Sequence, residues 1–415
     1  MDNNKSIGVY IHVPFCKSKC YYCDFNSYSG REYLAGSYFN ALFNEIEIRG
    51  KFTEDRCISS VFIGGGTPSL VVPGYISSLL DVCSKYMRLD KNAEISMESN
   101  PGTLTYDRLK AYRAAGVNRL SIGLQAWQDR LLKIIGRIHD RRQFIDNLDA
   151  SVRAGFDNIN ADLMFGLPQQ TMEDWAETID EIAKPGPIKH ISCYSLKIEK
   201  GTVFGERLEA GTLQLTDDEL DRQMYHYAVE KLADRGLKQY EISNFAMPGY
   251  ECRHNLIYWR AREYVGFGAG SHSFLDSVRY NNTVGIEEYI KAVDHICPGA
   301  YNPPGMGNGA EGVGGHGEGK VPNLTLHENF EVIGRNEAMS EYMILGLRLN
   351  EGIDSAEFEE RFGEKLENVY GRNLDKLVDK GLIAADRSDL PGRGVKYSLT
   401  ALGSDIANSV FIEFI

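Results

Sequence analysis

Three cysteines near the start of the chain have the spacing of metal ligands. Cys16, Cys20 and Cys23 lie within eight positions of one another in the stretch PFCKSKCYYCDFN. A structural zinc or a fully ligated iron–sulfur cluster normally takes four protein ligands, so this loop predicts a metal group with one open coordination position. A zinc ion with a distant fourth ligand, or ordinary buried thiols, are the alternatives. The other cysteines are isolated and are expected in the core: Cys57, Cys83, Cys193, Cys252 and Cys297.

A glycine-rich stretch, IGGGTPS at residues 63–69, follows the second apolar segment of the chain. Glycines in this position allow the backbone to come close to a ligand and to offer its N–H groups, which predicts a cradle for an anion or a carboxylate. The stretch is not a P-loop, because no Gly-Lys-Ser/Thr follows it. Glycines that only make a turn are the alternative reading.

The length, charge and cysteine content limit the class of protein. The chain has 415 residues, which predicts a large domain and a smaller second one, and its formal net charge of −13 argues against binding nucleic acid through phosphates. Eight cysteines are too few for a disulfide scaffold, and the N-terminal stretch lacks a signal peptide, which favours a cytoplasmic location. No apolar run approaches the roughly 20 residues that span a bilayer, so only peripheral membrane contact is open.

Short β-branched segments alternate with longer amphipathic ones over the first 245 residues. The predicted strands are SIGVYIHV, ISSVFIG, AEISMES, VNRLSIGL, FDNINADLMF, HISCYSL and LKQYEIS. Glycines at positions 116, 155 and 236 stand where a helix should end before the next strand. Strands that alternate with helices predict an α/β fold with a parallel sheet, and so many predict an incomplete (βα) barrel. A doubly wound open sheet is the alternative.

Polar residues recur where the predicted strands end. Cys16 follows the first strand, residues 64–67 follow the second, and Glu98, Gln125 and Asp162 follow the third, fourth and fifth. The carboxyl ends of parallel strands lie on one rim of a barrel, where ligands bind. These residues are therefore predicted to surround one cofactor site.

The second half of the chain divides by composition. Residues 246–297 contain the stretch CRHNLIYW, and residues 298–323 carry nine glycines and four prolines, which predicts a flexible loop. Residues 324–415 predict a small α+β, winged-helix-like domain. Because residues 335–415 hold fifteen acidic and ten basic side chains, this domain is expected to dock on the barrel or on a protein rather than on DNA.

These motifs together resemble the radical S-adenosylmethionine (SAM) superfamily. VYIHVPFCKSKCYYCDF, FIGGGTPS, ESNPGT, SIGLQ, GRIHD and DLMFGLPQQT resemble its HemN/HemW group, which contains oxygen-independent coproporphyrinogen III oxidases and heme chaperones. The resemblance implies a [4Fe-4S] cluster on Cys16, Cys20 and Cys23, with SAM at the open iron, and so explains why three thiolates suffice.

The resemblance also implies a set of residues in contact with SAM. Those matching the cluster-bound SAM are Tyr10, Gly65 and Glu98; those matching a second SAM are Gly66, Thr67, Gln125, Arg137 and Asp162, and Tyr22 is a further cofactor contact. Each has a structural alternative: the carboxylates could cap helices, Arg137 could be a surface charge, and Gln125 could bind a loop backbone.

Three departures favour the chaperones of this group over its oxidases. No fourth cysteine follows Cys23, only nine residues precede Tyr10, and His254, Tyr258 and Trp259 complete an HNxxYW signature. An imidazole can ligate heme iron, and aromatic rings can cover a flat macrocycle, so these three residues are heme candidates. His272 and Cys252 are further candidates, whereas His12 is expected to be a satisfied core histidine.

The leading hypothesis is a heme chaperone that binds the cluster, SAM and heme, and transfers heme to acceptor proteins such as respiratory-chain enzymes. The first alternative is oxidative decarboxylation of coproporphyrinogen III. The second is another radical SAM modification enzyme, for instance one acting on RNA, which the acidic charge and the HNLIYW stretch disfavour.

Overall fold

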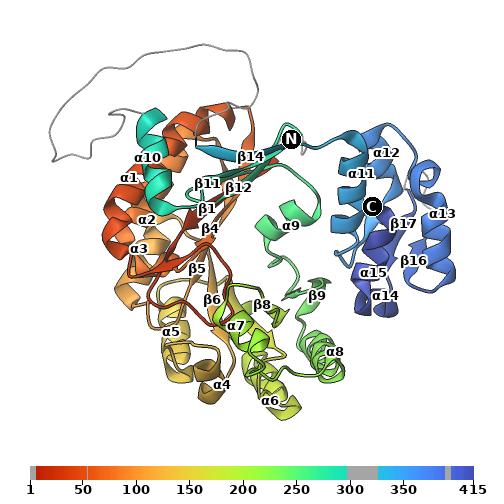
Figure 1. Cartoon of the computed structure of the whole chain (residues 1–415), viewed down its shortest axis with the longest axis horizontal. Coiled ribbons are helices and arrows are strands. Elements are labelled where there is room, and N and C mark those ends of the chain that lie inside the picture. Colours follow the sequence, from red (N-terminus) through yellow and green to blue (C-terminus); the bar gives the residue numbers. More distant parts are fainter. Residues whose placement is uncertain (1–5, 54, 297–325, 388–393) are drawn as a thin grey trace.

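The computed structural model describes residues 6–53, 55–296, 326–387 and 394–415. In these residues a large α/β domain lies beside a smaller C-terminal domain (Figure 1). The large domain is built on one sheet with the strand order β14-β13-β12-β11-β1-β4-β5-β6-β7-β8-β10-β9. The predicted α/β class and incomplete barrel are therefore confirmed. The predicted loop at 298–323 lies outside the described residues, and the proposed domain boundaries stay predictions.

Neighbouring strands at the centre of this sheet run parallel: β1 (Ser6–Val13), β4 (Cys57–Gly65), β5 (Leu89–Ser99), β6 (Arg119–Gln125), β7 (Ile159–Phe165) and β8 (Ile188–Ser195). The alternating side chains of β1 show which face of these strands lies in the core. Ile7, Val9 and Ile11 join the core under the helices, whereas Tyr10 and His12 face the space that the strands enclose. The enclosed face is thus free to carry polar side chains.

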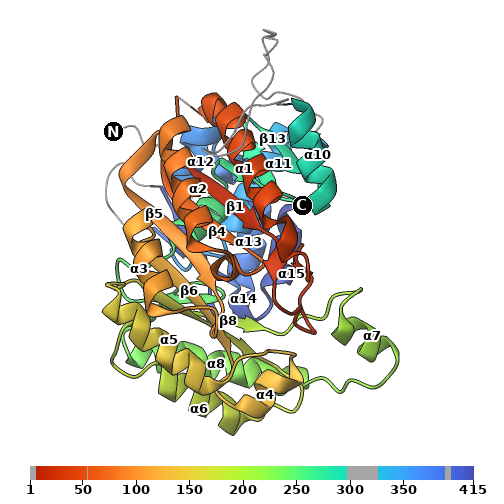
Figure 2. The ribbon, with the colours of Figure 1, turned by 90° about the vertical axis from the view of Figure 1, so that its left-hand side faces the viewer.

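The longer helices cover the outer face of the sheet (Figure 2): α1 (Ala35–Gly50), α2 (Pro73–Tyr86), α3 (Tyr106–Ala115), α5 (Arg141–Arg153), α6 (Met172–Ile182) and α8 (Asp218–Asp234). Shorter helices are α4 (Asp129–Ile134), α7 (Val203–Glu209), α9 (Arg253–Trp259) and α10 (Ile286–Ile296). Asp140 and Thr171 begin α5 and α6 with capping boxes. Gly116, Gly155 and Gly236 adopt positive φ after α3, α5 and α8, as predicted.

Two parts of the sheet differ from the sequence prediction. The stretch LKQYEIS forms β9 (Lys238–Glu241), but a tight turn sends the chain back as β10 (Asn244–Ala246), which pairs antiparallel with both β8 and β9. The expectation of a further neighbouring parallel strand there is therefore wrong. An unpredicted strand, β11 (Tyr264–Phe267), pairs parallel with β1. It continues the sheet through β12 (His272–Leu275), β13 (Val278–Asn282) and β14 (His327–Val332).

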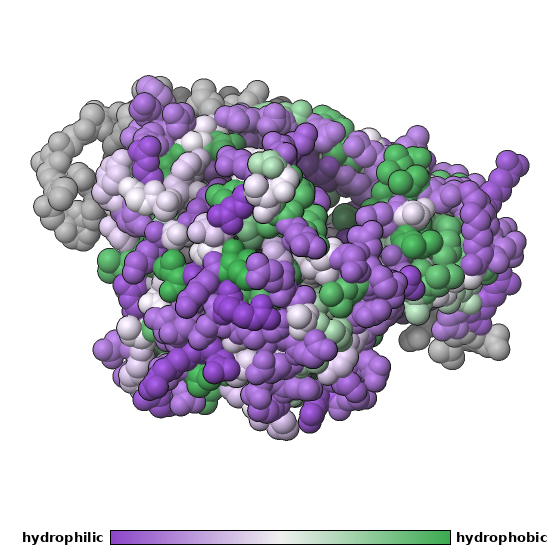
Figure 3. All heavy atoms as spheres, turned by 60° about the horizontal axis from the view of Figure 1, so that its bottom comes forward, coloured by the Kyte–Doolittle hydropathy of each residue, from purple (hydrophilic) through white to green (hydrophobic). Residues whose placement is uncertain are grey.

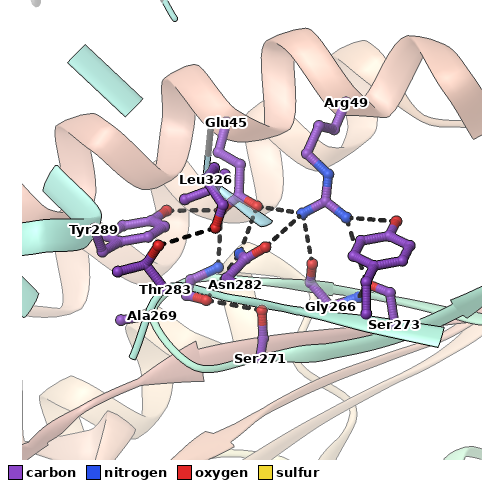
Figure 4. Close-up of polar contacts among 12 residues, drawn as sticks. Glu45, Arg49, Gly266, Ala269, Ser271, Ser273, Asn282, Thr283, Tyr289 and Leu326 are labelled. Atoms are coloured by element: carbon purple, nitrogen blue, oxygen red, sulfur yellow. Dashed lines mark hydrogen bonds and ion pairs between the residues drawn. The ribbon is translucent and has the colours of Figure 1, made fainter. Parts of the chain in front are cut away.

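A buried polar network fastens this extension of the sheet to α1 (Figure 4). Arg49 and Glu45, one helical turn apart on α1, form an ion pair and are 3% and 1% exposed. The Arg49 guanidinium donates to the Gly266 carbonyl at 2.9 Å and to the Tyr280 hydroxyl at 2.9 Å. The Glu45 carboxylate accepts hydrogen bonds from Gly268 N, Asn282 Nδ2 and Tyr289 Oη. The β11–β13 extension is thus tied to the first helix by charged hydrogen bonds.

The C-terminal domain has its own apolar core around Met343, Phe358 and Leu377. It contains α11 (Arg335–Gly346), α12 (Ser355–Phe362), α13 (Leu366–Asp379), α14 (Ala401–Asp405) and α15 (Ala407–Phe411). Its antiparallel sheet has β17 (Lys396–Leu399) between β15 (Ile353–Asp354) and β16 (Ile383–Asp386). The predicted small α+β domain is confirmed.

One face of the molecule is largely hydrophilic (Figure 3). No helix in the described residues is long and apolar enough to cross a membrane.

Candidate functional site

Two adjoining cavities lie where the parallel strands converge. The first, the cysteine cavity, has a volume of about 480 Å³ and is lined by the Cys16–Cys23 loop together with residues that follow β4, β5 and β6. The second, the inner cavity, has a volume of about 570 Å³ and lies among β1, β4, β6, β7, β8 and α9. Residues common to both linings are Phe25, Gly65, Glu98, Asp162 and Tyr194. A ligand in one cavity would therefore be adjacent to a ligand in the other.

The cysteine loop places its three thiols on the cysteine cavity. Cys16 ends the short strand β2 (Phe15–Cys16) and is buried, whereas Cys20 and Cys23 are half-buried. Burial raises the pKa of the Cys16 and Cys23 thiols, so metal binding must displace their protons. Three thiols on one cavity, each able to bind a separate iron, fit a cluster with one open coordination position.

The glycine-rich stretch after β4 uses its amides within the chain. The amide of Gly65 donates to the Glu98 carboxylate at 3.0 Å, and the amides of Gly66 and Thr67 donate to the carbonyls of Val13 and Phe15. A Cβ on Gly65 would lie 2.4 Å from the His12 ring, and one on Gly66 would lie 2.7 Å from the Phe15 carbonyl. One amide thus binds a carboxylate, as predicted, but this carboxylate belongs to the chain itself, and close packing against the first strand and the cysteine loop requires these glycines.

Arg137 reaches into the cysteine cavity from the segment after α4. Its guanidinium donates to Asn100 Oδ1 at 2.6 Å and to the Tyr22 hydroxyl at 3.1 Å. Its buried Nε atom has no hydrogen-bond partner in the described chain. Gly123 leaves room for this group, since a Cβ there would lie 2.9 Å from Asn100 Oδ1. Arg137 is thus a cavity cation held in place by its neighbours, not a surface charge.

Polar residues at the ends of β5 and β6 and in the middle of β7 also face the cysteine cavity. Gln125 ends β6 with φ of 72°, a left-handed conformation that costs a non-glycine residue free energy and often marks a functional position. Burial and, second, the Asp162 carboxylate raise the pKa of Glu98 to about 7. Asp162 accepts hydrogen bonds from Ser121 and Asn160, so it does not cap a helix.

Of the predicted SAM contacts, Tyr10 lines the inner cavity and Thr67 lies behind the cysteine cavity. The Tyr10 hydroxyl is 3.0 Å from His12 Nδ1, and His12 Nε2 is 2.7 Å from the Asn26 carbonyl. His12 is therefore satisfied, as predicted. The Thr67 hydroxyl lies 3.5 Å from Cys16 Sγ and accepts a hydrogen bond from Asn100. Thr67 can orient the first cysteine without touching the cavity.

The HNLIYW stretch forms α9, which closes the inner cavity. This helix packs against β1 and β4, on the side of the sheet that faces the C-terminal domain (Figure 1). The Glu94 carboxylate in β5 accepts hydrogen bonds from the amides of Arg253 and His254 and so caps α9. Gly8 in β1 allows the close approach, because a Cβ there would lie 2.9 Å from Ile257. The motif therefore has a structural role as a plug.

The heme candidates occupy different places on this plug. His254 is buried at 1% exposure, with Nδ1 2.9 Å from the Ser60 hydroxyl and Nε2 2.8 Å from the Tyr258 hydroxyl. Burial and, second, the nearby Arg119 guanidinium lower the pKa of His254 to about 3. Tyr258 lines the inner cavity, whereas Trp259 lies under Arg348, whose guanidinium carbon is 4.3 Å from the indole centroid. Iron ligation by His254 stays a prediction and requires one of its hydrogen bonds to break.

His272 is a second histidine on the inner cavity, and it is exposed at the start of β12. Its ring has no hydrogen bond to the residues that the structure describes. Cys252 is different again: it is buried at 0% exposure next to Glu94, and burial raises the pKa of its thiol to about 12. An accessible imidazole is thus available at His272, but no accessible thiolate at Cys252.

Several cavity residues escaped the sequence analysis. Asn100 positions Arg137 and Thr67, and it stands in the quoted stretch ESNPGT, so the signal was present. Arg119, Asn160 and Tyr194 line the inner cavity, but each is an ordinary polar residue in a strand. Their position depends on the closure of the sheet around α9, which no local pattern reveals.

The comparisons with known proteins agree with this geometry. The model of the radical SAM superfamily matches residues 10–182, and that of the HemN C-terminal domain matches residues 333–390. The protein named heme chaperone HemW of Bacillus subtilis (strain 168) is 34% identical over 409 residues, covering 98% of this chain and 99% of that protein. The protein of the same name from Lactococcus lactis subsp. lactis (strain IL1403) is 32% identical over 411 residues, covering 99% and 98%.

One solved structure shares nearly the whole architecture. Coproporphyrinogen III oxidase (HemN) from Escherichia coli, described as a radical SAM enzyme, has a TM-score of 0.78 at 22% identity. The match covers 99% of this chain and 90% of that one. At this identity the likeness shows the fold alone.

Proposed function

This chain belongs to the HemW family of the radical SAM superfamily, and we propose that it binds heme, a [4Fe-4S] cluster and SAM and transfers heme to acceptor proteins. One observation carries the proposal: a cavity lined by three cysteines adjoins a second cavity that the HNLIYW helix closes. The relatives named heme chaperone HemW, similar over nearly the full chain, support the same function.

The cysteine cavity fits the cluster and SAM. Cys16, Cys20 and Cys23 would hold the cluster. The unpartnered Nε of Arg137 and the strained Gln125 suit a polar ligand beside it. The residues that we propose contact SAM are Tyr10, Tyr22, Gly65, Gly66, Glu98, Gln125, Arg137 and Asp162, while Thr67 behind them orients Cys16. When bound, the cluster supplies an electron for the SAM sulfonium, and the chain's own residues orient SAM and exclude water.

The inner cavity fits the flat apolar body of heme. Tyr10, Phe62, Tyr258 and Tyr264 contribute aromatic rings to its lining. We propose that a histidine of this cavity ligates the iron. His272 has an accessible imidazole, whereas His254 requires a change in its hydrogen bonds to Ser60 and Tyr258.

We further propose a reducing, cytoplasmic location and heme proteins, including respiratory-chain enzymes, as acceptors. Free cysteines throughout the described chain suit a reducing compartment. The C-terminal domain contacts the barrel through ion pairs such as Arg260–Glu351. We propose that the acceptor protein binds to the surface of this domain.

The first test is a heme titration of the anaerobically reconstituted protein, followed by absorption spectroscopy. Wild type is expected to bind heme stoichiometrically, and one of two variants, His254→Ala or His272→Ala, is expected to change the heme spectrum. Cys20→Ser is expected to lose iron and the brown visible absorbance. The control Cys57→Ser, a half-buried cysteine outside both cavities, is expected to keep them.

Three outcomes would each overturn a part of the proposal. Absence of heme binding by wild type would reject heme trafficking. Conversion of coproporphyrinogen III to protoporphyrinogen by the reduced protein with SAM would reject a chaperone without oxidase activity. Full iron content in Cys20→Ser would reject the assignment of the cluster ligands.

A further inference from the structure

Arg119 begins β6 and is 2% exposed, yet its charged group faces a cavity. Within the described ranges its guanidinium makes no hydrogen bond and no ion pair, and its buried Nε atom is unpartnered. Buried arginines are normally paired, because an uncompensated buried charge costs several kcal/mol. An unpaired buried arginine that faces a cavity is typical of an anion-binding site whose anion is absent.

The groups around Arg119 do not neutralise it at close range. Burial lowers the pKa of Arg119, but the nearby Cys252, Glu94, Tyr240 and Asp162 raise it overall, although none of them is hydrogen-bonded or ion-paired to the guanidinium. Glu94 is used in capping α9, and Asp162 accepts hydrogen bonds from Ser121 and Asn160. The histidines that feel its charge, His190 and His254, have both ring nitrogens in hydrogen bonds. The guanidinium is thus left for a group that enters from the cavity.

The lining indicates the chemical class of that group. The inner cavity has a volume of about 570 Å³, within the roughly 300–1,000 Å³ typical of small-molecule sites. Aromatic rings of Tyr10, Phe62 and Tyr258 line it together with the hydroxyls and amides of Ser121, Asn160 and Ser192. A planar apolar ligand with a carboxylate fits both parts, because a guanidinium binds a carboxylate through two parallel hydrogen bonds.

We propose that Arg119 binds a carboxylate of the ligand in the inner cavity, and that this carboxylate is a heme propionate. The proposal rests on the heme-binding function proposed above and adds the residue that recognises the anionic edge of the macrocycle. SAM also carries a carboxylate, so the test separates the two sources. Loss of one charged hydrogen-bonded contact of about 1.5–3 kcal/mol corresponds to roughly a 10- to 100-fold weaker affinity.

The experiment compares heme with its dimethyl ester, which lacks both propionate charges, in one detergent-containing buffer. Wild type is expected to bind heme roughly 10- to 100-fold more tightly than the ester. Arg119→Gln is expected to bind both equally weakly, and Arg119→Lys to recover part of the preference. The control Arg56→Gln removes an arginine that is 12% exposed and paired with Glu263 and Asp276, away from both cavities, and is expected to keep the full preference.

The arms distinguish the possible failures. If wild type binds no heme, the proposed function fails. If wild type binds heme and the ester equally, only the role of Arg119 fails, and this arm holds even if Arg119→Gln does not fold. Calorimetric titration with SAM completes the test: an Arg119→Gln protein that loses SAM but keeps its preference for heme would assign the carboxylate to SAM and overturn the proposal.

Discussion

Two arginines of this chain are equally buried and yet have opposite surroundings. Arg49 on α1 is 3% exposed and bonds to Glu45, Gly266 and Tyr280 (Figure 4), whereas Arg119 on β6 is 2% exposed and has no such partner in the described residues. The first lies between a helix and the sheet, and the second faces a cavity. A buried charge that is fully paired contributes to the fold, whereas one left unpaired beside a cavity is available for a ligand.

The largest effect is expected from breaking the paired site. Arg49→Leu leaves the Glu45 carboxylate buried without its counter-ion, which should lower the free energy of unfolding by about 3–5 kcal/mol. Urea unfolding of wild type and variant measures this decrease in the free energy of unfolding. Glu45→Gln combined with Arg49→Met removes both charges and should recover most of the loss. A decrease below about 1 kcal/mol for Arg49→Leu would show that the network is not a unit of stability.

A smaller effect is expected at a carboxylate of the cavity, Glu98. Burial raises its pKa from 4.5 to about 7 in the folded protein, so the folded state prefers the protonated form. The contribution of Glu98 to the free energy of unfolding is therefore complete below about pH 4.5. It falls by up to about 3 kcal/mol as the pH rises towards 7, and it levels off above that pH. Glu98→Gln should remove this slope. Parallel unfolding curves of wild type and variant from pH 5 to pH 8, without cofactors, would contradict the assignment.

A still smaller effect is expected from removing Arg119 in the absence of ligand. Arg119→Gln deletes no hydrogen bond and no ion pair in the described structure, and it relieves an unpaired buried charge. The free energy of unfolding should therefore stay the same or rise, and should not fall by more than about 1 kcal/mol. Urea unfolding of Arg119→Gln and Arg49→Leu under the same conditions compares the two changes in the free energy of unfolding. A loss as large as that of Arg49→Leu would mean that the charges of Glu94 and Asp162 hold Arg119 for folding.

The same contrast explains what could be predicted from the sequence. The alternation of strands and helices placed Cys16, Gly65, Glu98, Gln125 and Asp162 at strand ends, and the structure brings all of them to one cavity. Such predictions depend on local periods and on the rule that parallel strands end together. The glycines that end α3, α5 and α8 were predictable for the same reason.

What failed depends on contacts between distant segments. The amides of residues 65–67 are taken by the Glu98 carboxylate and by the first strand and the cysteine loop, so the carboxylate that this stretch binds is one of the chain's own. Arg119 stands between Asn118 and Leu120 like any strand residue, and its burial beside a cavity depends on α9, far along the chain. The sequence analysis therefore considered a loop motif for anion binding, whereas we propose a single strand side chain, Arg119.

The smallest effect is expected for an exposed pair near the paired site. Arg31 Nη1 lies 2.8 Å from Glu287 Oε1 on α10, and the two side chains are 47% and 42% exposed. Water and salt screen such pairs, and ordering two long side chains offsets the attraction. Arg31→Ala should leave the midpoint of thermal unfolding unchanged at both low and high salt. A shift comparable to that of Arg49→Leu would show that charge pairing near α10 stabilises the sheet extension regardless of burial, and the distinction between paired and cavity arginines would then need another cause.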